Sequence, residues 1–391
     1  MHIAWLGKKS PFCGNVTYGR EVTNALLERG YQVSFLHFDQ EEAESEHWWG
    51  SQEVSLPCIY KSQIYTIPTL TASKVLKRSL QQLKPDIVHA SLTLSPLDFL
   101  LPEICEELNI PLVATFHPPF DGKRRNLKSG TPLFTYQLYA PFLAHYDQVI
   151  VFSHLQRNFL VRLGVPPKRV VVIPNGVDAQ KYSPGASHLK LQLKAQRLFV
   201  YQGRISTEKN VESLLRAWKQ CHLDEQSKLL IVGDGPLTTS LMPFYGSEYG
   251  IIWWGFEADE QRRIDILRSA DVFILPSLLE GLSLSLLEAM ACGVACVATD
   301  AGADGEVLEK GAGVVLHTHR VTSQLHTLLP VLNDHQEWTD LLGQKARARV
   351  LERYTLSCNI TGLEKLYTEM LQMRASSEYV LQTGYVNGVK K

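Results

Sequence analysis

Residues 271–300 have the sequence DVFILPSLLEGLSLSLLEAMACGVACVATD. Two apolar runs of strand length, residues 272–275 and 294–298, lie on either side of a helical pattern that extends through Met290. Gly293 leads into the second run, as expected where a helix ends. The stretch therefore predicts a βαβ unit with two buried parallel strands.

Two acidic residues lie where the first strand gives way to the helix: Glu280 in the loop and Glu288 in the early helical turns. Ligands of open parallel sheets bind at the carboxyl ends of the strands, and the free N–H groups of a helix N-terminus attract anions. The backbone of residues 281–285 is therefore a candidate binding site for phosphate. A structural interpretation competes, because Ser277 with Glu280 and Ser285 with Glu288 each match the Ser-x-x-Glu capping box.

Composition limits the classes of protein to consider. The chain has 391 residues, enough for two domains, and 45% hydrophobic with 20% charged residues describe a globular protein. Its net charge of −1 provides no general attraction to nucleic acid, so we expect none as a partner. Scattered cysteines without a Cys-x-x-Cys pair predict a reducing, cytoplasmic environment and no structural metal. No apolar run approaches the ~20 residues of a membrane-spanning helix, so we expect any membrane contact to be peripheral.

The N-terminal half alternates apolar runs with helical patterns, which predicts a parallel sheet covered on both faces. The predicted strands are residues 2–6, 33–38, 87–89, 112–116, 149–152 and 169–174. The predicted helices are residues 22–29, 72–83 and 96–108. Residues 14–17 are predicted as a loop, and residues 117–132, rich in Pro, Gly and cations, as a long functional loop.

The C-terminal half repeats this alternation. Its predicted strands before the βαβ unit are residues 198–202, 229–232 and 251–254, with helices at 211–220 and 260–269. Turn residues in IPNGVDAQKYSPG and the polar residues 185–197 place the domain crossing between the halves. We therefore predict an N-terminal domain at 1–180, a C-terminal domain at 181–375 and a flexible tail at 376–391. The last helical pattern, residues 343–373, is expected to pack back on the first domain.

A family resemblance adds to this interpretation. Glu280, Glu288 and the intervening GLSLSLL resemble the Glu-x7-Glu signature of the retaining glycosyltransferases of family 4. The similarity continues through AMACGVACVATDAG, so the motif is long and specific. The resemblance implies the α/β GT-B fold, in which two Rossmann-like domains face each other across a cleft. It also implies that the first domain binds the acceptor, that the second binds a nucleotide sugar, and that the anomeric configuration is retained.

Sugar transfer from a nucleotide diphosphate leaves negative charge on the departing diphosphate, which many enzymes neutralise with a metal held by paired aspartates. This chain contains no Asp-x-Asp pair. Arg204 and Lys209, five residues apart after a predicted strand, can supply fixed positive charge instead. Two such cations in a polar loop are usually solvated, but these match the family's Gly-Arg…Glu-Lys motif. We therefore expect them to bind the diphosphate, and we expect neither a metal nor a cofactor.

The resemblance places three more side chains at the donor. Glu280 would accept hydrogen bonds from hydroxyls of the donor sugar and stabilise positive charge at the anomeric carbon. Glu288 would bind both ribose hydroxyls through its two oxygens. His117, at the end of a predicted strand, would lie at the donor sugar, although a lone histidine is more often structural. Glu280, His117, Arg204 and Lys209 form the predicted catalytic group.

Further residues are predicted to bind the donor. They are Gly14, Gly233, Gly255, Phe256, Gly281, Leu282, Ser283 and Leu284. Gly14 stands where the family has a glycine-rich loop, although Cys13-Gly14-Asn15 lacks the usual double glycine. Gly233 belongs to VGDGP, which resembles a dinucleotide fingerprint only in part, because Thr238 replaces its third glycine and disfavours NAD. Gly255 and Phe256 are expected near the nucleotide base.

The mechanism stays open at this stage. The family is usually described by front-face attack, in which the departing phosphate oxygen takes the acceptor's proton. A covalent intermediate on Glu280 is the competing mechanism.

Residues of the N-terminal half indicate the acceptor. The cations are Lys123, Arg124, Arg125 and Lys128, and the aromatic residues that follow at helical spacing are Tyr136, Tyr139 and Phe142. Such a combination suits an anionic bilayer surface, but also a solvated loop beside a core helix. Trp48 and Trp49 are a further candidate membrane anchor.

Three readings of the function compete. KKSPFCGN, HASLTLSPLDFLLPE and TFHPPFDGKRRNLKSGT resemble cyanobacterial and plastid-type family 4 enzymes of digalactosyldiacylglycerol synthesis, which implies galactose transfer from UDP-galactose to the lipid monogalactosyldiacylglycerol. A transferase for a soluble sugar or polysaccharide is the second. A non-catalytic nucleotide-sugar binding protein is the third, and is disfavoured because Arg204, Lys209 and Glu280 are all present.

Overall fold

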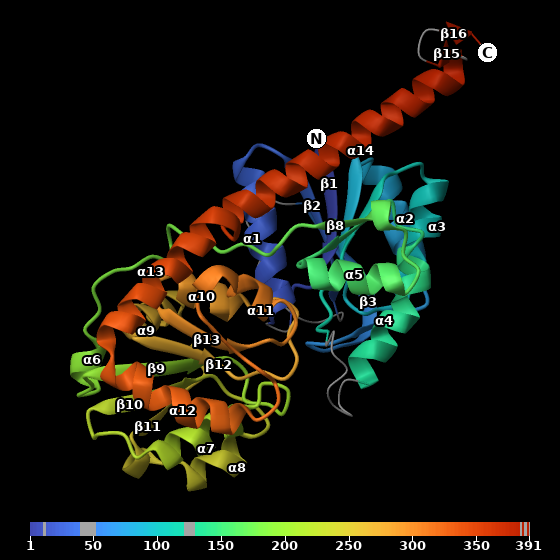
Figure 1. The fold of residues 1–391 in the computed structure, drawn as a ribbon. Helices are drawn as coiled ribbons and strands as arrows, with labels where there is room; N and C mark the ends of the chain where they lie inside the picture. Colours follow the sequence, from blue (N-terminus) through green and yellow to red (C-terminus); the bar gives the residue numbers. More distant parts are fainter. Residues whose placement is uncertain (11–12, 40–51, 121–129, 384, 387–388, 391) are drawn as a thin grey trace.

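The computed structural model describes residues 1–10, 13–39, 52–120, 130–383, 385–386 and 389–390. Two α/β domains lie side by side, each built around a largely parallel sheet with helices on both faces (Figure 1). The two-domain α/β architecture predicted from the sequence is therefore confirmed. The boundaries of the domains stay predictions.

The first domain contains an eight-stranded sheet with the strand order β4-β3-β2-β1-β5-β6-β7-β8. Its strands are β1 (His2–Gly7), β2 (Gln32–Asp39), β3 (Gln52–Lys61), β4 (Thr66–Pro68), β5 (Ile87–Ser91), β6 (Leu112–Thr115), β7 (Gln148–Val151) and β8 (Val170–Val172). β3 and β4 form an antiparallel hairpin, and the other neighbouring strands pair in parallel. Its helices are α1 (Gly14–Glu28), α2 (Ala72–Leu83), α3 (Leu101–Glu107), α4 (Gly130–Leu143) and α5 (His154–Arg162), with the 3-10 helices η1 (Pro96–Phe99) and η3 (Pro167–Arg169).

The second domain contains a six-stranded parallel sheet with the strand order β11-β10-β9-β12-β13-β14. Its strands are β9 (Arg197–Gln202), β10 (Ser227–Val232), β11 (Ile251–Gly255), β12 (Val272–Leu275), β13 (Ala295–Thr299) and β14 (Val314–Leu316). Its α-helices are α6 (Leu189–Gln192), α7 (Val211–Cys221), α8 (Thr238–Leu241), α9 (Glu260–Ser269), α10 (Leu284–Ala291), α11 (Asp304–Val307), α12 (Val321–Asp334) and α13 (Gln336–Arg353).

The βαβ unit predicted from residues 271–300 consists of β12, α10 and β13. All four residues of β12 are buried, because the strand lies between β9 and β13 inside the sheet. α10 ends before Gly293, whose φ of +78° is a left-handed conformation that favours glycine. The N–H of Gly293 donates to the carbonyl oxygen of Met290, which closes the helix end.

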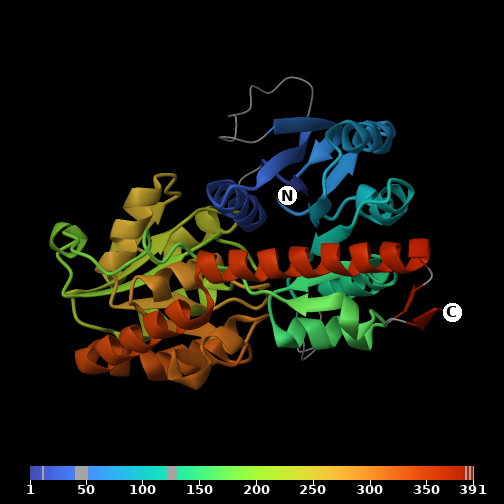
Figure 2. The same ribbon diagram turned by 90° about the horizontal axis from the view of Figure 1, so that it is seen from above.

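The chain crosses between the domains twice, and the two crossings are hydrogen-bonded to each other. The N–H of Val177 donates to the carbonyl oxygen of Tyr354, and the N–H of Leu356 donates to the carbonyl oxygen of Val177. α14 (Leu356–Thr383) then runs from the second domain along the first, where it contacts α1 (Figures 1 and 2). The single helix predicted at residues 343–373 is wrong, because the backbone at 354–356 pairs with Val177 instead of continuing α13.

The apolar core connects the two domains. One cluster of buried side chains includes Trp5 and Tyr18 of the first domain, Tyr367 of α14 and Phe273 of the second domain. The hydroxyl of Tyr367 forms a hydrogen bond with Nδ1 of His89, a buried residue of β5. α14 therefore contributes to the core of the first domain although it follows the second domain in the sequence.

Two other expectations differ from the structure. The loop predicted at residues 14–17 is wrong, because α1 begins at Gly14 after the extended residue Cys13. The long loop predicted at residues 117–132 lies partly outside the described residues, and α4 begins at Gly130.

Candidate active site

Glu280 is a buried acid in the loop between β12 and α10. Nζ of Lys209 donates to its Oε1 at 2.6 Å, and Oγ of Ser277 donates to the same oxygen at 2.7 Å. Two donors from its own domain therefore fix the direction of the carboxylate. The pair brings together two residues that the sequence predicted for one site.

Lys209 supplies a fixed positive charge beside Glu280. Burial alone lowers the pKa of Lys209, but the carboxylate of Glu280 and the hydrogen bond between them raise it, and the net pKa lies above the ordinary value. The ammonium group therefore stays charged at the carboxyl edge of the second sheet. A charge held in place before the ligand arrives needs little reorganisation to stabilise an anion.

Asp304, the first residue of α11, joins this group from the segment that follows β13. It is fully buried, its Oδ1 accepts the N–H of Ser283 at 3.0 Å, and its Oδ2 is buried with no hydrogen-bond partner among the described residues. Burial, and then the carboxylate of Glu280, raise the pKa of Asp304 well above its usual range, while Lys209 lowers it. The neutral carboxyl form of Asp304 is therefore favoured.

The N-terminus of α10 is capped by Ser283, whose Oγ accepts the N–H of Leu286 at 3.3 Å. Ser277 donates to Glu280 instead of capping a helix, and Ser285 lies inside α10. The capping-box interpretation of Glu280 and Glu288 is therefore wrong. Neither acid is therefore used to cap the N-terminus of the helix, and both are available for other roles.

This capping reduces the number of backbone N–H groups that can bind phosphate. The N–H of Ser283 is bonded to Asp304, and the N–H of Leu286 is bonded to the Ser283 hydroxyl. Leu284 and Ser285, the first two residues of α10, have no intrahelical acceptor for their N–H groups. They are the N–H groups of the predicted segment 281–285 that the helix geometry leaves open to an anion.

The two domains meet beside Glu280. The N–H of Phe120, in the first domain, donates to the carbonyl oxygen of Glu280 at 3.1 Å. A Cβ at Gly281 would lie 3.0 Å from the carbonyl oxygen of His117, so glycine permits this close approach. Leu282, which follows, is buried. The loop that begins at His117 is thus held against the loop that carries Glu280.

Arg204 follows β9 and contacts the first domain. Its Nη1 donates to Oε1 of Gln63, in the turn of the β3–β4 hairpin, at 3.0 Å. The buried Nζ of Lys8 donates to the carbonyl oxygens of Ser62 and Gln63 and so positions the same turn. Arg204 therefore lies at the domain interface, whereas Lys209 is held by Glu280. Their joint role at a diphosphate stays a prediction.

His117 lies at the carboxyl end of β6 between two aromatic rings whose centroids are 5.1 and 5.2 Å from its own. Its Nε2 is 2.8 Å from Oγ of Ser91, and that hydroxyl donates its proton to Oδ1 of Asn15 at 2.7 Å. Because a hydroxyl has one proton, Ser91 must accept from His117, which places the ring hydrogen on Nε2. Burial, and then the charge of Lys8, lower the pKa of His117 to about 3, so the ring is neutral.

Glu288 projects from α10 into a different environment. Nε2 of Gln202 donates to its Oε2 at 3.2 Å. Burial raises the pKa of Glu288 to about 7, with a lowering contribution from Arg263 and a further raising contribution from Glu260. Glu288 therefore changes its charge near neutral pH.

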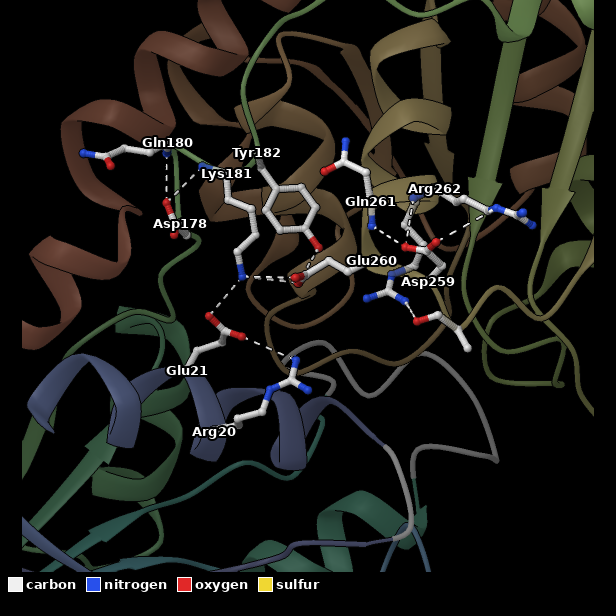
Figure 3. Close-up of polar contacts among 12 residues, drawn as sticks. Arg20, Glu21, Asp178, Gln180, Lys181, Tyr182, Asp259, Glu260, Gln261 and Arg262 are labelled. Atoms are coloured by element: carbon white, nitrogen blue, oxygen red, sulfur yellow. Dashed lines mark hydrogen bonds and ion pairs between the residues drawn. The ribbon is translucent and has the colours of Figure 1, made fainter. Parts of the chain in front are cut away.

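An ion-pair network around Lys181 connects the two domains (Figure 3). Lys181, in the crossing, lies 3.2 Å from Glu260 of α9 and 3.6 Å from Glu21 of α1. The hydroxyl of Tyr182 lies 3.4 Å from Oε1 of Glu260, and its single proton can be donated either to Glu260 or to Glu288, whose pKa this hydrogen bond lowers. The network thus links the crossing to the predicted ribose-binding residue.

The other predicted glycines have different environments. A Cβ at Gly14 or Gly255 would meet nothing within 4 Å, so both leave open space. Gly233, with φ of +130°, would place a Cβ 2.0 Å from the carbonyl oxygen of Gly203, so glycine is needed there for the close approach of two strand ends. Phe256, after β11, is 64% exposed, and its contact with a nucleotide base stays a prediction.

The predicted membrane-binding residues are only partly described. Lys123, Arg124, Arg125, Lys128, Trp48 and Trp49 lie outside the described residues. Tyr136 and Tyr139 are buried, and their hydroxyls donate to the carbonyl oxygen of Pro118 and to Oδ2 of Asp98. Of the two interpretations offered for these tyrosines, the core helix is therefore correct and the bilayer surface is wrong. Phe142 is exposed.

Three residues of the site were missed from the sequence: Asp304, Ser91 and Gln63. Asp304 and Ser91 follow or end strands at the carboxyl edge of a sheet, the same position that indicated Glu280 and His117. Gln63 has no such signal, because its contact with Arg204 depends on how the two domains meet.

In the described part of the chain, no three His, Cys, Asp or Glu side chains are grouped as metal ligands would be. Among the described helices, none combines the length and the apolar character required to span a bilayer. Metal independence stays a prediction.

Comparison with known families gives two matches. Residues 14–181 match the model described as "Glycosyltransferase Family 4", and residues 196–334 match the model described as "Glycosyl transferases group 1". The two matches together cover more than three quarters of the chain.

Similar sequences come from several organisms. The chain is 27% identical to an Escherichia coli UDP-Gal:alpha-D-GlcNAc-diphosphoundecaprenol alpha-1,3-galactosyltransferase, over 76% of this chain and 78% of that protein. It is 24% identical to the N-acetyl-alpha-D-glucosaminyl L-malate synthase of Bacillus anthracis, over 92% of this chain and 94% of that protein. It is also 24% identical to a sulfoquinovosyl transferase of Arabidopsis thaliana, over 89% of this chain and 68% of that protein.

Solved structures share the fold. A sucrose-phosphate synthase from Thermosynechococcus elongatus superposes with a TM-score of 0.76 at 20% identity, covering 95% of this chain and 99% of that one. Anabaena HepE in complex with UDP gives a TM-score of 0.75 at 17% identity, covering 94% and 100%. These likenesses confirm the predicted GT-B fold.

Proposed function

This chain belongs to the glycosyltransferases of family 4, and on that premise we propose that it transfers galactose from UDP-galactose to a glycolipid, with retention of configuration. The proposed acceptor is monogalactosyldiacylglycerol, and the product is digalactosyldiacylglycerol. The observation that carries the proposed chemistry is the Lys209–Glu280 pair beside the open N-terminus of α10. It combines a fixed cation, backbone N–H donors and an oriented carboxylate at one strand end.

The donor is proposed to lie along the carboxyl edge of the second sheet. Lys209, Arg204 and the N–H groups of Leu284 and Ser285 would bind the diphosphate. Glu288 would accept hydrogen bonds from the two ribose hydroxyls. Phe256, which is exposed after the end of β11, would contact the base. Glu280, which is hydrogen-bonded to Lys209, would then lie next to the diphosphate and face the sugar.

The proposed step is a substitution at the anomeric carbon. The bond from that carbon to the diphosphate oxygen breaks with both electrons going to the diphosphate, and the acceptor hydroxyl oxygen forms the new bond on the same face. The acceptor's proton passes to the departing phosphate oxygen. Lys209 and Arg204 stabilise the charge that the diphosphate gains, and Glu280 stabilises the positive charge at the sugar.

His117 has a positioning role in this scheme. Its neutral ring donates from Nε2 to Ser91, so it is not poised to take a proton at that nitrogen. Its carbonyl oxygen lies against Gly281. We propose that His117 shapes the sugar-binding side of the site from the first domain.

The glycolipid acceptor rests on two supports. The N-terminal phrases resemble enzymes of digalactosyldiacylglycerol synthesis, and the E. coli relative is named for UDP-Gal and a diphosphoundecaprenol-linked acceptor. A soluble acceptor is the second candidate, because the B. anthracis relative is named for L-malate as the group that carries its sugar.

A donor and acceptor screen tests the proposal. The purified chain is incubated with radiolabelled UDP-galactose or UDP-glucose, and with either monogalactosyldiacylglycerol vesicles or soluble sugars. We expect label from UDP-galactose in a digalactosyl lipid, and NMR of the product should show the donor's α configuration. Equal transfer to soluble sugars without lipid would overturn the glycolipid assignment, and a β-linked product would overturn retention.

A further inference from the structure

α4 has no charged residue in its sequence, GTPLFTYQLYAPFL, yet it lies at the surface of the first domain. One side of the helix is buried through Tyr136 and Tyr139. The other side exposes Phe134 (65%), Leu138 (43%) and Phe142 (37%), which are spaced four residues apart and so share one face. Large apolar side chains that share one helix face are normally covered, so this outer face lacks a partner in the described chain.

A second exposed apolar group lies next to this face. Ile64, Tyr65 and Ile67 are exposed on the β3–β4 hairpin. β4 packs on η1, and the ring of Phe99 in η1 lies 4.3 Å from the ring of Phe142 in α4. Of the 21 large apolar side chains exposed in the described part of the chain, ten lie between residues 59 and 142. Exposed large apolar side chains are therefore concentrated in this segment of the first domain.

Both groups are connected directly to the candidate site. The hydroxyl of Tyr136 in α4 donates at 2.8 Å to the carbonyl oxygen of Pro118, the residue after His117. The turn of the hairpin contacts Arg204 through Gln63 at 3.0 Å. Whatever covers the exposed side chains is therefore brought beside the place where the sugar is transferred.

We propose that this surface docks on a lipid bilayer and thereby presents the head group of a membrane-resident acceptor to the site. The docking face consists of Phe134, Leu138 and Phe142 of α4 with Ile64, Tyr65 and Ile67 of the hairpin. The inference rests on the proposed function and adds the surface through which the lipid acceptor is reached. The acyl chains stay in the membrane while the sugar head group enters between the domains.

Charge and composition favour a bilayer over a protein partner. Residues 123–128, which lead into α4, carry four cations in the sequence and no acid, and basic segments attract anionic lipid surfaces. Phenylalanine, tyrosine and aliphatic side chains are also those that enter the boundary between head groups and acyl chains. A second copy of the chain is the competing occupant, and the experiment below distinguishes it.

The test measures binding of the full chain to vesicles by flotation. One set of vesicles contains phosphatidylcholine alone, and the other contains phosphatidylcholine with phosphatidylglycerol. We expect binding that is stronger on the anionic vesicles and weakened by salt. The double variant Phe134→Ser with Leu138→Ser should lower the vesicle partition coefficient by roughly tenfold or more, because two apolar side chains no longer leave water.

A matched control uses exposed side chains of the second domain. Phe244 is 66% exposed and Leu341 is 48% exposed, so Phe244→Ser with Leu341→Ser removes similar apolar surface away from the docking face. This variant should bind vesicles as the wild type does. Equal loss of binding in both double variants would overturn the proposal.

A variant that keeps an aromatic side chain at position 134 tests docking without removing apolar surface, so a loss of folding cannot explain the result. Phe134→Trp should give a tryptophan emission that shifts to shorter wavelength when vesicles are added, after subtraction of the wild-type signal, whereas Phe244→Trp should not. Absence of the shift would overturn the proposal. So would sedimentation that shows a wild-type dimer, dissociated by the Phe134 and Leu138 changes, without vesicle binding.

Failure of the docking face and failure of the proposed function would give different results. Transfer to monogalactosyldiacylglycerol in detergent micelles with no vesicle binding would refute the docking face and leave the proposed function intact. Vesicle binding through α4 with transfer only to soluble sugars would refute the proposed acceptor and leave the surface contact intact.

Discussion

At the scale of single residues, the two acids of the signature are separated by their surroundings. Glu280 is held by the cation of Lys209 and the hydroxyl of Ser277. Glu288 has an amide donor, Gln202, and its pKa is raised mainly by burial and further by its acidic neighbour Glu260. One carboxylate is thus kept oriented beside a positive charge, and the other is held near its titration point.

This difference predicts different kinetic effects. Glu280→Gln should lower kcat by at least about 100-fold, because a charge aimed at the transition state is removed. Glu288→Ala should raise the donor KM by roughly tenfold or more with a smaller change in kcat, because hydrogen bonds to bound ribose are lost in ground and transition states alike. Steady-state kinetics, with donor affinity measured by calorimetry, will separate the two. The reverse pattern would refute the role assignment.

The raised pKa of Glu288 predicts pH-dependent donor use. Burial raises this pKa to about 7, so Glu288 is neutral below and ionised above that pH. Since the carboxylate is the better acceptor for two ribose hydroxyls, kcat/KM for the donor should rise as the pH increases through 7 and then level off, by up to about tenfold per pH unit on the acid side. His117 does not titrate in this range, because its pKa is about 3. In Glu288→Gln this rise should disappear, and its persistence would assign the titration to another group.

Side-chain cations in place of a metal predict resistance to chelation. Lys209 keeps its charge through Glu280, and Arg204 is always charged. Turnover should therefore be unchanged after EDTA treatment and exhaustive dialysis, and Mg²⁺ should not increase it. Arg204→Ala provides the positive control for lost diphosphate binding and should lower kcat/KM by roughly 100-fold. Complete loss of activity with EDTA would refute the scheme.

At the scale of elements, the loop after β13 supports the N-terminus of α10. The N–H of Ala303 donates to the carbonyl oxygen of Gly281 at 2.8 Å, and Asp304 accepts the N–H of Ser283. Gly302, with φ of +55°, would place a Cβ 2.1 Å from the carbonyl oxygen of Glu280. Backbone contacts from the loop after β13 therefore hold the loop that carries Glu280 in place.

Substitutions of Asp304 test this support. Asp304→Ala leaves the N–H of Ser283 buried without an acceptor, which should cost about 1–3 kcal/mol of unfolding free energy and raise the donor KM. Asp304→Asn keeps an acceptor oxygen and resembles the neutral carboxyl that burial favours, so its stability and KM should stay close to wild type. Denaturant unfolding and donor kinetics measure both. An Asn variant as impaired as the Ala variant would indicate that Asp304 acts in its ionised form.

The elements that the sequence predicted best are those with strong local boundaries. β12 begins and ends at the predicted residues, because a continuous apolar run is closed by Pro276. The buried face of α4 could not be predicted, because a helix without charged residues does not indicate which side faces the core, so a bilayer surface and a core helix stayed open for its tyrosines. Gln63 could not be predicted either, because it reaches the site from the other domain and its contact with Arg204 has no signal in the local sequence.

At the scale of the whole molecule, the relative position of the domains depends on the paired crossings. Val177 bonds with Tyr354 and Leu356, and Nδ2 of Asn359 donates to the carbonyl oxygen of Pro174 at 2.6 Å. The apolar core continues through this region into α14. The contacts of Arg204 with Gln63 and of Glu280 with Phe120 exist only in this arrangement, so the site is a property of both domains together.

Gly176 is the residue at which this arrangement is most easily tested. A Cβ there would lie 2.4 Å from the carbonyl oxygen of Thr355, a backbone atom of the second crossing that cannot move aside on its own. Gly176→Ala should therefore force the crossings apart, lower the unfolding free energy by about 1–3 kcal/mol and reduce kcat/KM, because the domains no longer meet correctly at Glu280. Gly185→Ala is the matched control, since its Cβ would lie 2.9 Å from Nε of Arg268, a flexible side chain that can shift. Thermal unfolding and steady-state kinetics of both variants decide the point, and equal effects would show that the paired crossings do not set the domain arrangement.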